Sequence, residues 1–168
     1  MSERVIEGRS GATAAGVART VRLRVNGAER VVEAHAGETL LDLLRERCRV
    51  VSPKRGCAPA GQCGSCVALV GGVPHATCTI AADACEGLDV VTVEGLAAGE
   101  RDQFARAFAA THGLQCGFCT PGLVIRAHHL LETNASPSRA EIAASLGEHL
   151  CRCTGWIKVI DAIDAVAR

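Results

Sequence analysis

Residues 56–66 read Gly56-Cys57-Ala58-Pro59-Ala60-Gly61-Gln62-Cys63-Gly64-Ser65-Cys66, which places three cysteines within ten residues. The residues between these cysteines are mostly small, flexible or turn-forming. Glycine lacks a Cβ and adopts backbone angles that other residues avoid, so such a loop can wrap closely around an inorganic centre. A fourth candidate thiol, Cys78, lies twelve residues after Cys66. The pattern predicts a loop that binds a metal centre through four thiolates.

A second group of four cysteines lies near the C-terminus. It consists of a C-x2-C pair, Cys116 and Cys119, and a C-x-C pair, Cys151 and Cys153. The first group has the spacing C-x5-C-x2-C, which is one residue longer than the C-x4-C-x2-C spacing of plant-type [2Fe–2S] ferredoxins. Two sets of four thiols indicate two clusters.

The composition excludes several classes of protein. Hydrophobic residues make up 48% of the 168 residues, which supports a packed core rather than disorder. The 18 basic and 18 acidic side chains cancel, so the basic surface that nucleic-acid binding requires is not expected. No apolar run approaches the roughly 18 residues of a membrane span.

The ten cysteines point to ligation rather than to disulfides. The first eight residues lack the basic-then-apolar pattern of a secretory signal, so we expect a cytoplasmic protein. Disulfide frameworks are typical of small secreted domains and are rare in a reducing compartment. Metal or cluster ligation therefore explains the cysteine content better.

The first half of the chain has the pattern of a small sheet with one helix. Residues 1–19 show no usable period and are expected to form a flexible tail. Val21–Val25 alternates as a half-buried strand, Asn26-Gly27 is a strong hairpin signal, and Arg30–Ala34 is expected to return antiparallel. Leucines at helical spacing predict an amphipathic helix over Thr39–Arg47.

A second hairpin follows the cysteine-rich loop. Cys66–Val70 and Val73–Cys78 flank Gly71-Gly72, and this pairing brings Cys78 back to the level of Cys66. A last strand is expected at Val90–Val93, before a linker of small residues over 95–99. Together these elements predict a β-grasp-like α+β unit.

Beyond residue 100 the apolar period becomes helical, and four helices with short connections predict a small bundle. Apolar spacing indicates the first and last helices, and capping or first-turn residues indicate the middle two. In chain order the indicating residues are Phe104 with Phe108, Thr120 with Pro121, Ser138 with Glu141, and Ile160 with Ile163.

The two cysteine groups differ in how clearly their spacing favours an iron–sulfur cluster over a zinc ion. In the first group one tight loop supplies three ligands, and its amides, helped by Gly61 and Gly64, can point at sulfur. Zinc sites usually pair two short C-x2-C knuckles, so the first group favours a cluster. The second group, taken alone, has a two-plus-two pattern that leaves zinc open as an alternative.

Three motifs together resemble one family. They are Cys63-Gly64-Ser65-Cys66, Leu114-Gln115-Cys116-Gly117-Phe118-Cys119-Thr120-Pro121-Gly122, and Leu150-Cys151-Arg152-Cys153-Thr154-Gly155. With these motifs the chain resembles the small iron–sulfur subunit of the molybdenum hydroxylases, the family of xanthine oxidase and aerobic carbon monoxide dehydrogenase. The resemblance covers about Thr20 to Ala167.

This resemblance implies an N-terminal β-grasp, plant-type ferredoxin-like domain over residues 20–95 and a C-terminal four-helix bundle over residues 100–168. Each domain would hold one [2Fe–2S] cluster. By the same resemblance, the residue before the first bundle cysteine, Gln115, contacts the molybdopterin cofactor of a partner, and no catalytic residue lies in this chain. The implied cluster ligands are Cys57, Cys63, Cys66 and Cys78 in the first domain, and Cys116, Cys119, Cys151 and Cys153 in the second.

The implied function is electron transfer from the molybdopterin centre through both clusters to an acceptor. The implied partners are a large molybdopterin-binding subunit and a medium FAD-binding subunit or another electron acceptor. Two alternatives remain from the residues alone. A free-standing ferredoxin-like carrier would usually show a strong charge of one sign for steering, whereas this chain is neutral. A zinc-stabilised interaction domain would be colourless, whereas an iron–sulfur protein is brown.

The two remaining cysteines, Cys48 and Cys85, belong to neither group and give the first test. We predict that Cys48→Ser and Cys85→Ser each retain the full iron content, because neither removes a ligand. Iron analysis and the cluster spectra of both variants check this. Loss of one cluster's signal in either variant would contradict the assignment of the eight ligands.

Overall fold

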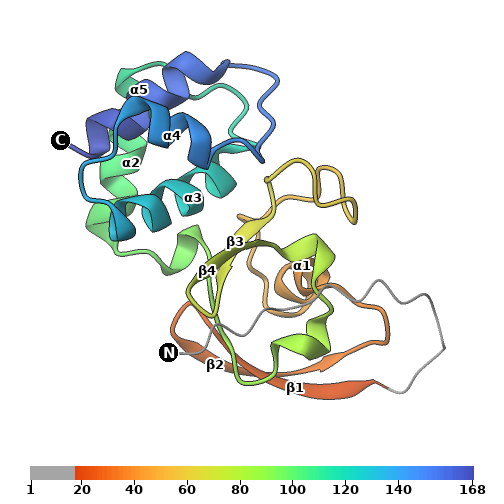
Figure 1. The fold of residues 1–168 in the computed structure, drawn as a ribbon. Helices are drawn as coiled ribbons and strands as arrows, with labels where there is room; N and C mark the ends of the chain where they lie inside the picture. Colours follow the sequence, from red (N-terminus) through yellow and green to blue (C-terminus); the bar gives the residue numbers. More distant parts are fainter. Residues whose placement is uncertain (1–17) are drawn as a thin grey trace.

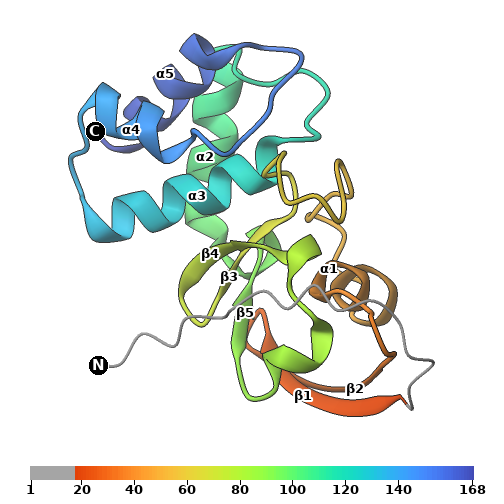
Figure 2. The same ribbon diagram turned by 45° about the vertical axis from the view of Figure 1, so that its right-hand side comes forward.

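The computed structural model describes residues 18–168 and combines a five-stranded sheet with helices. Figures 1 and 2 show the sheet and, beyond its β3–β4 end, the helices of the second half of the chain. The predicted tail over residues 1–19 lies almost entirely outside the described residues, and Arg19 already belongs to the first strand. Of the helices in residues 18–168, none has the length and apolar character needed to cross a bilayer.

The sheet is mixed, with the order β2-β1-β5-β3-β4. Strands β1 and β5 run parallel, and the other neighbours are antiparallel. The long connection from β1 to β5 holds the short helix, the cysteine-rich loop and the second hairpin. The five strands are β1 (Arg19–Val25), β2 (Ala28–Ala34), β3 (Val67–Val70), β4 (Val73–Ala76) and β5 (Asp89–Val91).

Both predicted hairpins are confirmed. Asn26 and Gly27 adopt φ values of 52° and 80°, and Gly71 and Gly72 adopt 61° and 88°. Two consecutive residues with positive φ form the tight turns whose twist matches that of the flanking strands. The registers follow directly, with Val25 opposite Ala28 and Val70 opposite Val73.

The predicted helix over Thr39–Arg47 is confirmed in extent, but its second half differs in type. The α-helical part, α1, covers only Leu40–Asp42, and Leu43–Arg47 continues it as a π-helical turn. Thr39 caps the helix through a capping box with Asp42. Four leucines of this segment are completely buried, and three of them, Leu40, Leu43 and Leu44, pack in the core beneath the sheet.

Two strand boundaries differ from the predictions. Cys78 lies in a 3₁₀ turn, Thr77–Thr79, that follows β4, rather than in the strand itself. The last strand ends at Val91, and Val93–Gly95 forms another 3₁₀ turn that leads to the helices. At both positions the chain turns away from the sheet toward another element. The strand therefore ends where tertiary packing requires it, and the residue types do not show that end.

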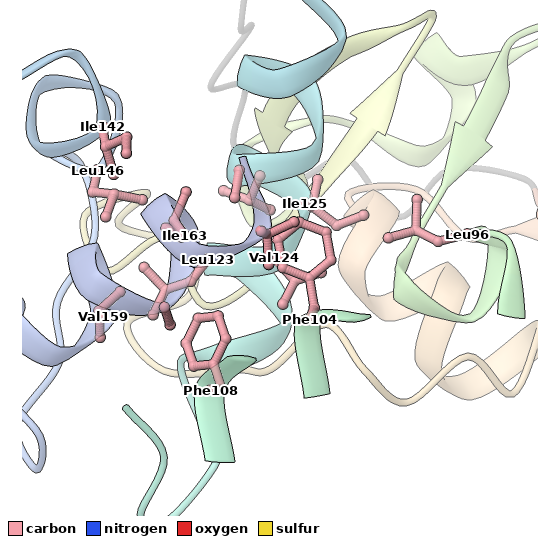
Figure 3. Close-up of a cluster of buried hydrophobic side chains, with 14 of the residues drawn as sticks. Leu96, Phe104, Phe108, Leu123, Val124, Ile125, Ile142, Leu146, Val159 and Ile163 are labelled. Carbon is pink, nitrogen blue, oxygen red and sulfur yellow. The ribbon is translucent and has the colours of Figure 1, made fainter. Parts of the chain in front are cut away.

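The second half contains α2 (Ala98–Ala110), α3 (Thr120–Thr133), α4 (Arg139–Ser145) and α5 (Trp156–Val166). The capping box of Ser138 and Glu141 is confirmed at the start of α4. Helix α3 begins at Thr120 with Cys119 as its N-cap, one residue earlier than the predicted cap. The helices share one buried core (Figure 3), to which Phe104, Phe108, Leu123, Ile142 and Ile163 contribute.

Strand β3 belongs to both cores, because its four residues alternate between the two faces of the sheet and all four are buried. Val67 and Leu69 pack in the helical core, whereas Ala68 and Val70 pack beneath the sheet. Because the same strand packs in both cores, the sheet and the helices cannot move apart without exposing buried side chains. The cysteine loop, which ends where β3 begins, is therefore held in a fixed position relative to the helices.

Candidate cluster-binding sites

The first cysteine group surrounds the loop over residues 56–66. Cys63, Cys66 and Cys78 are buried, and Cys57 is half-buried. The backbone N–H groups of Gln62 and Cys63 donate to Cys57 Sγ, at 3.1 and 3.3 Å. Amides that point at a thiolate stabilise its negative charge, as the loop of a bound cluster requires.

The thiols of this group interact in pairs. Burial and the neighbouring Cys66 thiol raise the pKa of Cys78 to about 12. Burial alone would also raise the pKa of Cys63, but hydrogen bonds from Ser65 and from the Cys57 thiol lower it. The Cys57 thiol is thus the hydrogen-bonding neighbour of Cys63 and the Cys66 thiol that of Cys78, while the charge of Cys57 also acts on Cys78.

The second group is paired in the same way, across the two connections between helices. Cys116 Sγ and Cys153 Sγ lie 3.5 Å apart. Burial and the neighbouring Cys151 thiol raise the pKa of Cys119 to about 12. Burial by itself would raise the pKa of Cys151, but hydrogen bonds, first among them the one with Thr154 Oγ1 at 3.1 Å, lower it to about 7.

Pairing is the arrangement that a binuclear cluster needs. In a [2Fe–2S] cluster two protein ligands serve each of the two irons, whereas a four-cysteine zinc site gathers all four thiolates on one ion. The donor chemistry and the four thiol pairs fit two [2Fe–2S] clusters.

Glycines allow the first loop to pass close to its thiols. Gly61 and Gly64 both adopt φ of +67°, in the left-handed region that favours glycine. A Cβ at Gly56 would lie 2.8 Å from Cys63 Sγ and 3.2 Å from the Phe118 ring. The backbone conformation at Gly61 and Gly64 is therefore one that favours glycine, and the Gly61 backbone also acts on the Cys78 thiol, in the direction that lowers its pKa.

Both cysteine groups open onto one cavity of about 410 Å³. Cys57 and Cys63 line it from the first half, and all four thiols of the second group line it from the helical half. The rest of its wall is formed by Gly56, Ser65, Phe118, Leu150 and Arg152. Gln115, the predicted cofactor-contacting residue, lies at the second group, where its Nε2 donates to the backbone oxygen of Cys153 at 3.1 Å.

The sequence analysis missed the contact that joins the two groups. A Cβ at Gly122 in α3 would lie 2.1 Å from the backbone oxygen of Gly64, so the helix and the loop touch directly. Leu150 N–H donates to the oxygen of Cys63 at 3.1 Å. His149 is 2% exposed at this junction, and burial followed by the charge of Arg126 lowers its pKa to about 4. The sequence gives no indication that His149 lies at this junction, because a single histidine beside a cysteine motif belongs to no recognisable pattern.

Comparison with known proteins agrees with this geometry. Residues 23–90 match the model of the 2Fe-2S iron-sulfur cluster binding domain, and residues 92–164 match that of a [2Fe-2S] binding domain. The nicotinate dehydrogenase small FeS subunit of Eubacterium barkeri is 37% identical over 86% of this chain and 92% of its own length. The nicotine 6-hydroxylase small subunit of Paenarthrobacter nicotinovorans is 39% identical over 85% of this chain and 86% of its own length.

The chain belongs to the [2Fe–2S] subunits of the molybdenum hydroxylase family. The resemblance drawn from the three motifs is thereby confirmed. Among solved structures, quinoline 2-oxidoreductase from Pseudomonas putida 86 superimposes with a TM-score of 0.84 and 40% identity, over 89% of this chain and 94% of that one.

In other family members the same unit is part of a longer chain. The aldehyde oxidoreductase from Desulfovibrio desulfuricans ATCC 27774 superimposes with a TM-score of 0.81 and 34% identity. The match covers 88% of this chain but only 17% of that protein. The cluster-binding unit therefore occurs in the family both as a subunit and as a segment of a larger polypeptide.

The contact between Gly122 and Gly64 yields a prediction about stability. Gly122→Ala should lower the free energy of unfolding by about 1 to 3 kcal/mol, because its Cβ would overlap the loop backbone. Gly99→Ala in α2 is the matched control, since its Cβ would meet nothing within 4 Å. Ala is favoured over Gly in helices by roughly 0.5 to 1 kcal/mol, so the control should be neutral or slightly stabilised. Urea unfolding of both variants measures the difference, and equal stability would contradict the close contact.

Proposed function

We propose that this chain transfers electrons between the molybdopterin centre of a large partner subunit and a second acceptor, through two [2Fe–2S] clusters. The observation that carries the proposal is the set of four thiol pairs in two groups that open onto one cavity. The proposed ligands are Cys57, Cys63, Cys66 and Cys78 for the N-terminal cluster, and Cys116, Cys119, Cys151 and Cys153 for the C-terminal cluster.

The chain's own residues bind the clusters and control their surroundings. When bound, a [2Fe–2S] cluster supplies one-electron redox chemistry, with a potential set by net charge, hydrogen bonds to sulfur and solvent exposure. The amides of Gln62 and Cys63 supply hydrogen bonds at Cys57, and burial of Cys63, Cys66 and Cys78 excludes water from most of the first group. No acid–base residue is assigned to this chain, since the substrate would be bound by the partner.

The surroundings of the second group support contact with a partner there. Cys116 and Cys153 are exposed, and apolar side chains around them are exposed as well. Exposed apolar side chains gathered in one place are typical of protein interaction sites. These side chains are Leu114, Phe118 and Leu150, and the last two line the cavity beside Cys116 and Cys153. The large molybdopterin-binding subunit is the proposed partner at this face.

The proposal also covers the domain bounds, the electron acceptor and the location of the protein. We propose an N-terminal β-grasp domain over residues 20–95 and a four-helix bundle over residues 100–168, supported by the separate cores on the two faces of β3. We further propose a medium FAD-binding subunit as the acceptor of the electrons. A cytoplasmic location is supported by ten cysteines, none of which forms a disulfide.

The metal content tests this function directly. Anaerobically purified protein should contain about four irons and four acid-labile sulfides per chain, because each of the two clusters holds two irons and two sulfides. Dithionite should reduce both clusters and produce two cluster signals in electron paramagnetic resonance (EPR) spectra. Two irons per chain, or zinc as the main metal, would contradict the proposed ligands.

Gln115 gives a second test, which concerns the partner. We propose that its amide contacts the molybdopterin and couples it to the C-terminal cluster. Gln115→Ala should keep both clusters, because no thiolate is lost, and should remove about 1 to 2 kcal/mol of interaction with the cofactor. Rapid-mixing reduction of the assembled complex should then show a slower cluster phase at unchanged iron content.

The bond from Gln115 Nε2 to the Cys153 oxygen defines the competing role, which is bracing of the ligand turn. If Gln115 only braces that turn, Gln115→Ala would lose iron from the C-terminal cluster. That result, or an unchanged reduction phase at full iron content, would contradict the proposed contact with the cofactor.

A further inference from the structure

His149 occupies the junction between the two cluster-binding groups. Its ring packs so tightly on Gly64 that a Cβ there would lie 2.5 Å from ring carbon Cδ2. On its other side the ring faces Gly122 of α3, where a Cβ would lie 3.3 Å from Nε2. The imidazole is thus wedged between the turn that separates Cys63 from Cys66 and the first turn of α3.

The chemistry of this ring is unusual for a packing residue. His149 is 2% exposed, neither of its ring nitrogens makes a hydrogen bond of ordinary geometry, and the only hydrogen-bonding group that acts on its pKa is the Gly122 backbone. A buried polar group without a partner is destabilising compared with an apolar group of the same shape. The role of His149 is therefore expected to lie in its position. The ring touches the loop between two proposed ligands, Cys63 and Cys66.

We propose that His149 is a positioning residue that holds the Gly64 turn in place and thereby sets the reduction potential of the N-terminal cluster. The inference rests on the proposed cluster ligands. Gly64 lies between Cys63 and Cys66, and its backbone oxygen also meets α3 and accepts from Val67 N–H at 3.1 Å. Displacement of this turn would reorient the amides beside both ligands.

The physical link to the potential is hydrogen bonding and water. Residues that orient the ligands of a metal site tune its properties, and the potentials of iron–sulfur clusters respond to hydrogen bonds and solvent exposure. Removal of the ring would leave space at the junction and let the turn relax toward it. Water in that space would stabilise the more negative, reduced cluster, so the potential should rise.

The test uses the assembled complex with four variants, three of which are analysed first for iron and then by EPR-monitored redox titration. His149→Ala removes the wedge, whereas His149→Phe keeps an aromatic ring in its place. Val159→Ala is the matched control, because it also removes a buried side chain from the helical half. Val159 is completely buried in the helical core, and the atoms nearest to a Cβ at Gly64 all belong to His149. The signal of the N-terminal cluster is identified by its loss in Cys66→Ser.

We expect His149→Ala to keep four irons and to shift the potential of the N-terminal cluster upward. His149→Phe should remain near the potential of the unmodified protein, and so should Val159→Ala. Selective loss of the N-terminal cluster in His149→Ala, with retention in His149→Phe, would also support the role of the wedge.

Three results would overturn the inference: an unchanged potential in His149→Ala, an equal shift in Val159→Ala, or an equal shift or cluster loss in His149→Phe. Failure of the proposed function is distinct, because the unmodified complex would then lack four irons.

Discussion

The arrangement of this protein depends on one close backbone contact, in which the first turn of α3 meets the Gly64 turn of the cysteine loop. A Cβ at Gly122 would overlap the Gly64 oxygen, so glycine is required for the two to touch. Strand β3, which follows the loop, is buried on both faces by the two cores. The contact and the shared strand together hold both thiol groups beside one cavity, which Cys57 and Cys63 line from the first group and all four thiols line from the second.

This rigidity suits electron transfer, in which the protein supplies position and electrostatics and the cofactors supply the chemistry. An electron carrier gains from fixed distances between its centres and from small rearrangements on reduction. Here the hydrogen bond from Leu150 N–H to the Cys63 oxygen links the connection between α4 and α5, just before Cys151, to a proposed ligand of the other group. The same packing that stabilises the fold therefore also sets the relation between the two proposed clusters.

Much of the structure follows from local sequence, because its causes act over a few residues. Asn26-Gly27 and Gly71-Gly72 form the predicted turns, since few other residue pairs tolerate consecutive positive φ values. Ser138 and Glu141 form the predicted capping box. Spacing alone separated two groups of four thiols from Cys48 and Cys85, because ligands that one segment supplies to a common centre lie close together in the chain.

The rest depends on tertiary packing, which no local pattern encodes. The spacing predicted two groups of four thiols, but the pairing of Cys116 with Cys153 arises because two separate helix connections meet at one end of the helices. The π-helical turn at Leu43–Arg47 and the 3₁₀ turn at Cys78 likewise depend on what each segment packs against. The sequence by itself indicated the eight candidate ligands, the two hairpin turns and the capping box of α4. Only the folded chain revealed His149 and the glycine contact, because these join residues from opposite halves of the sequence.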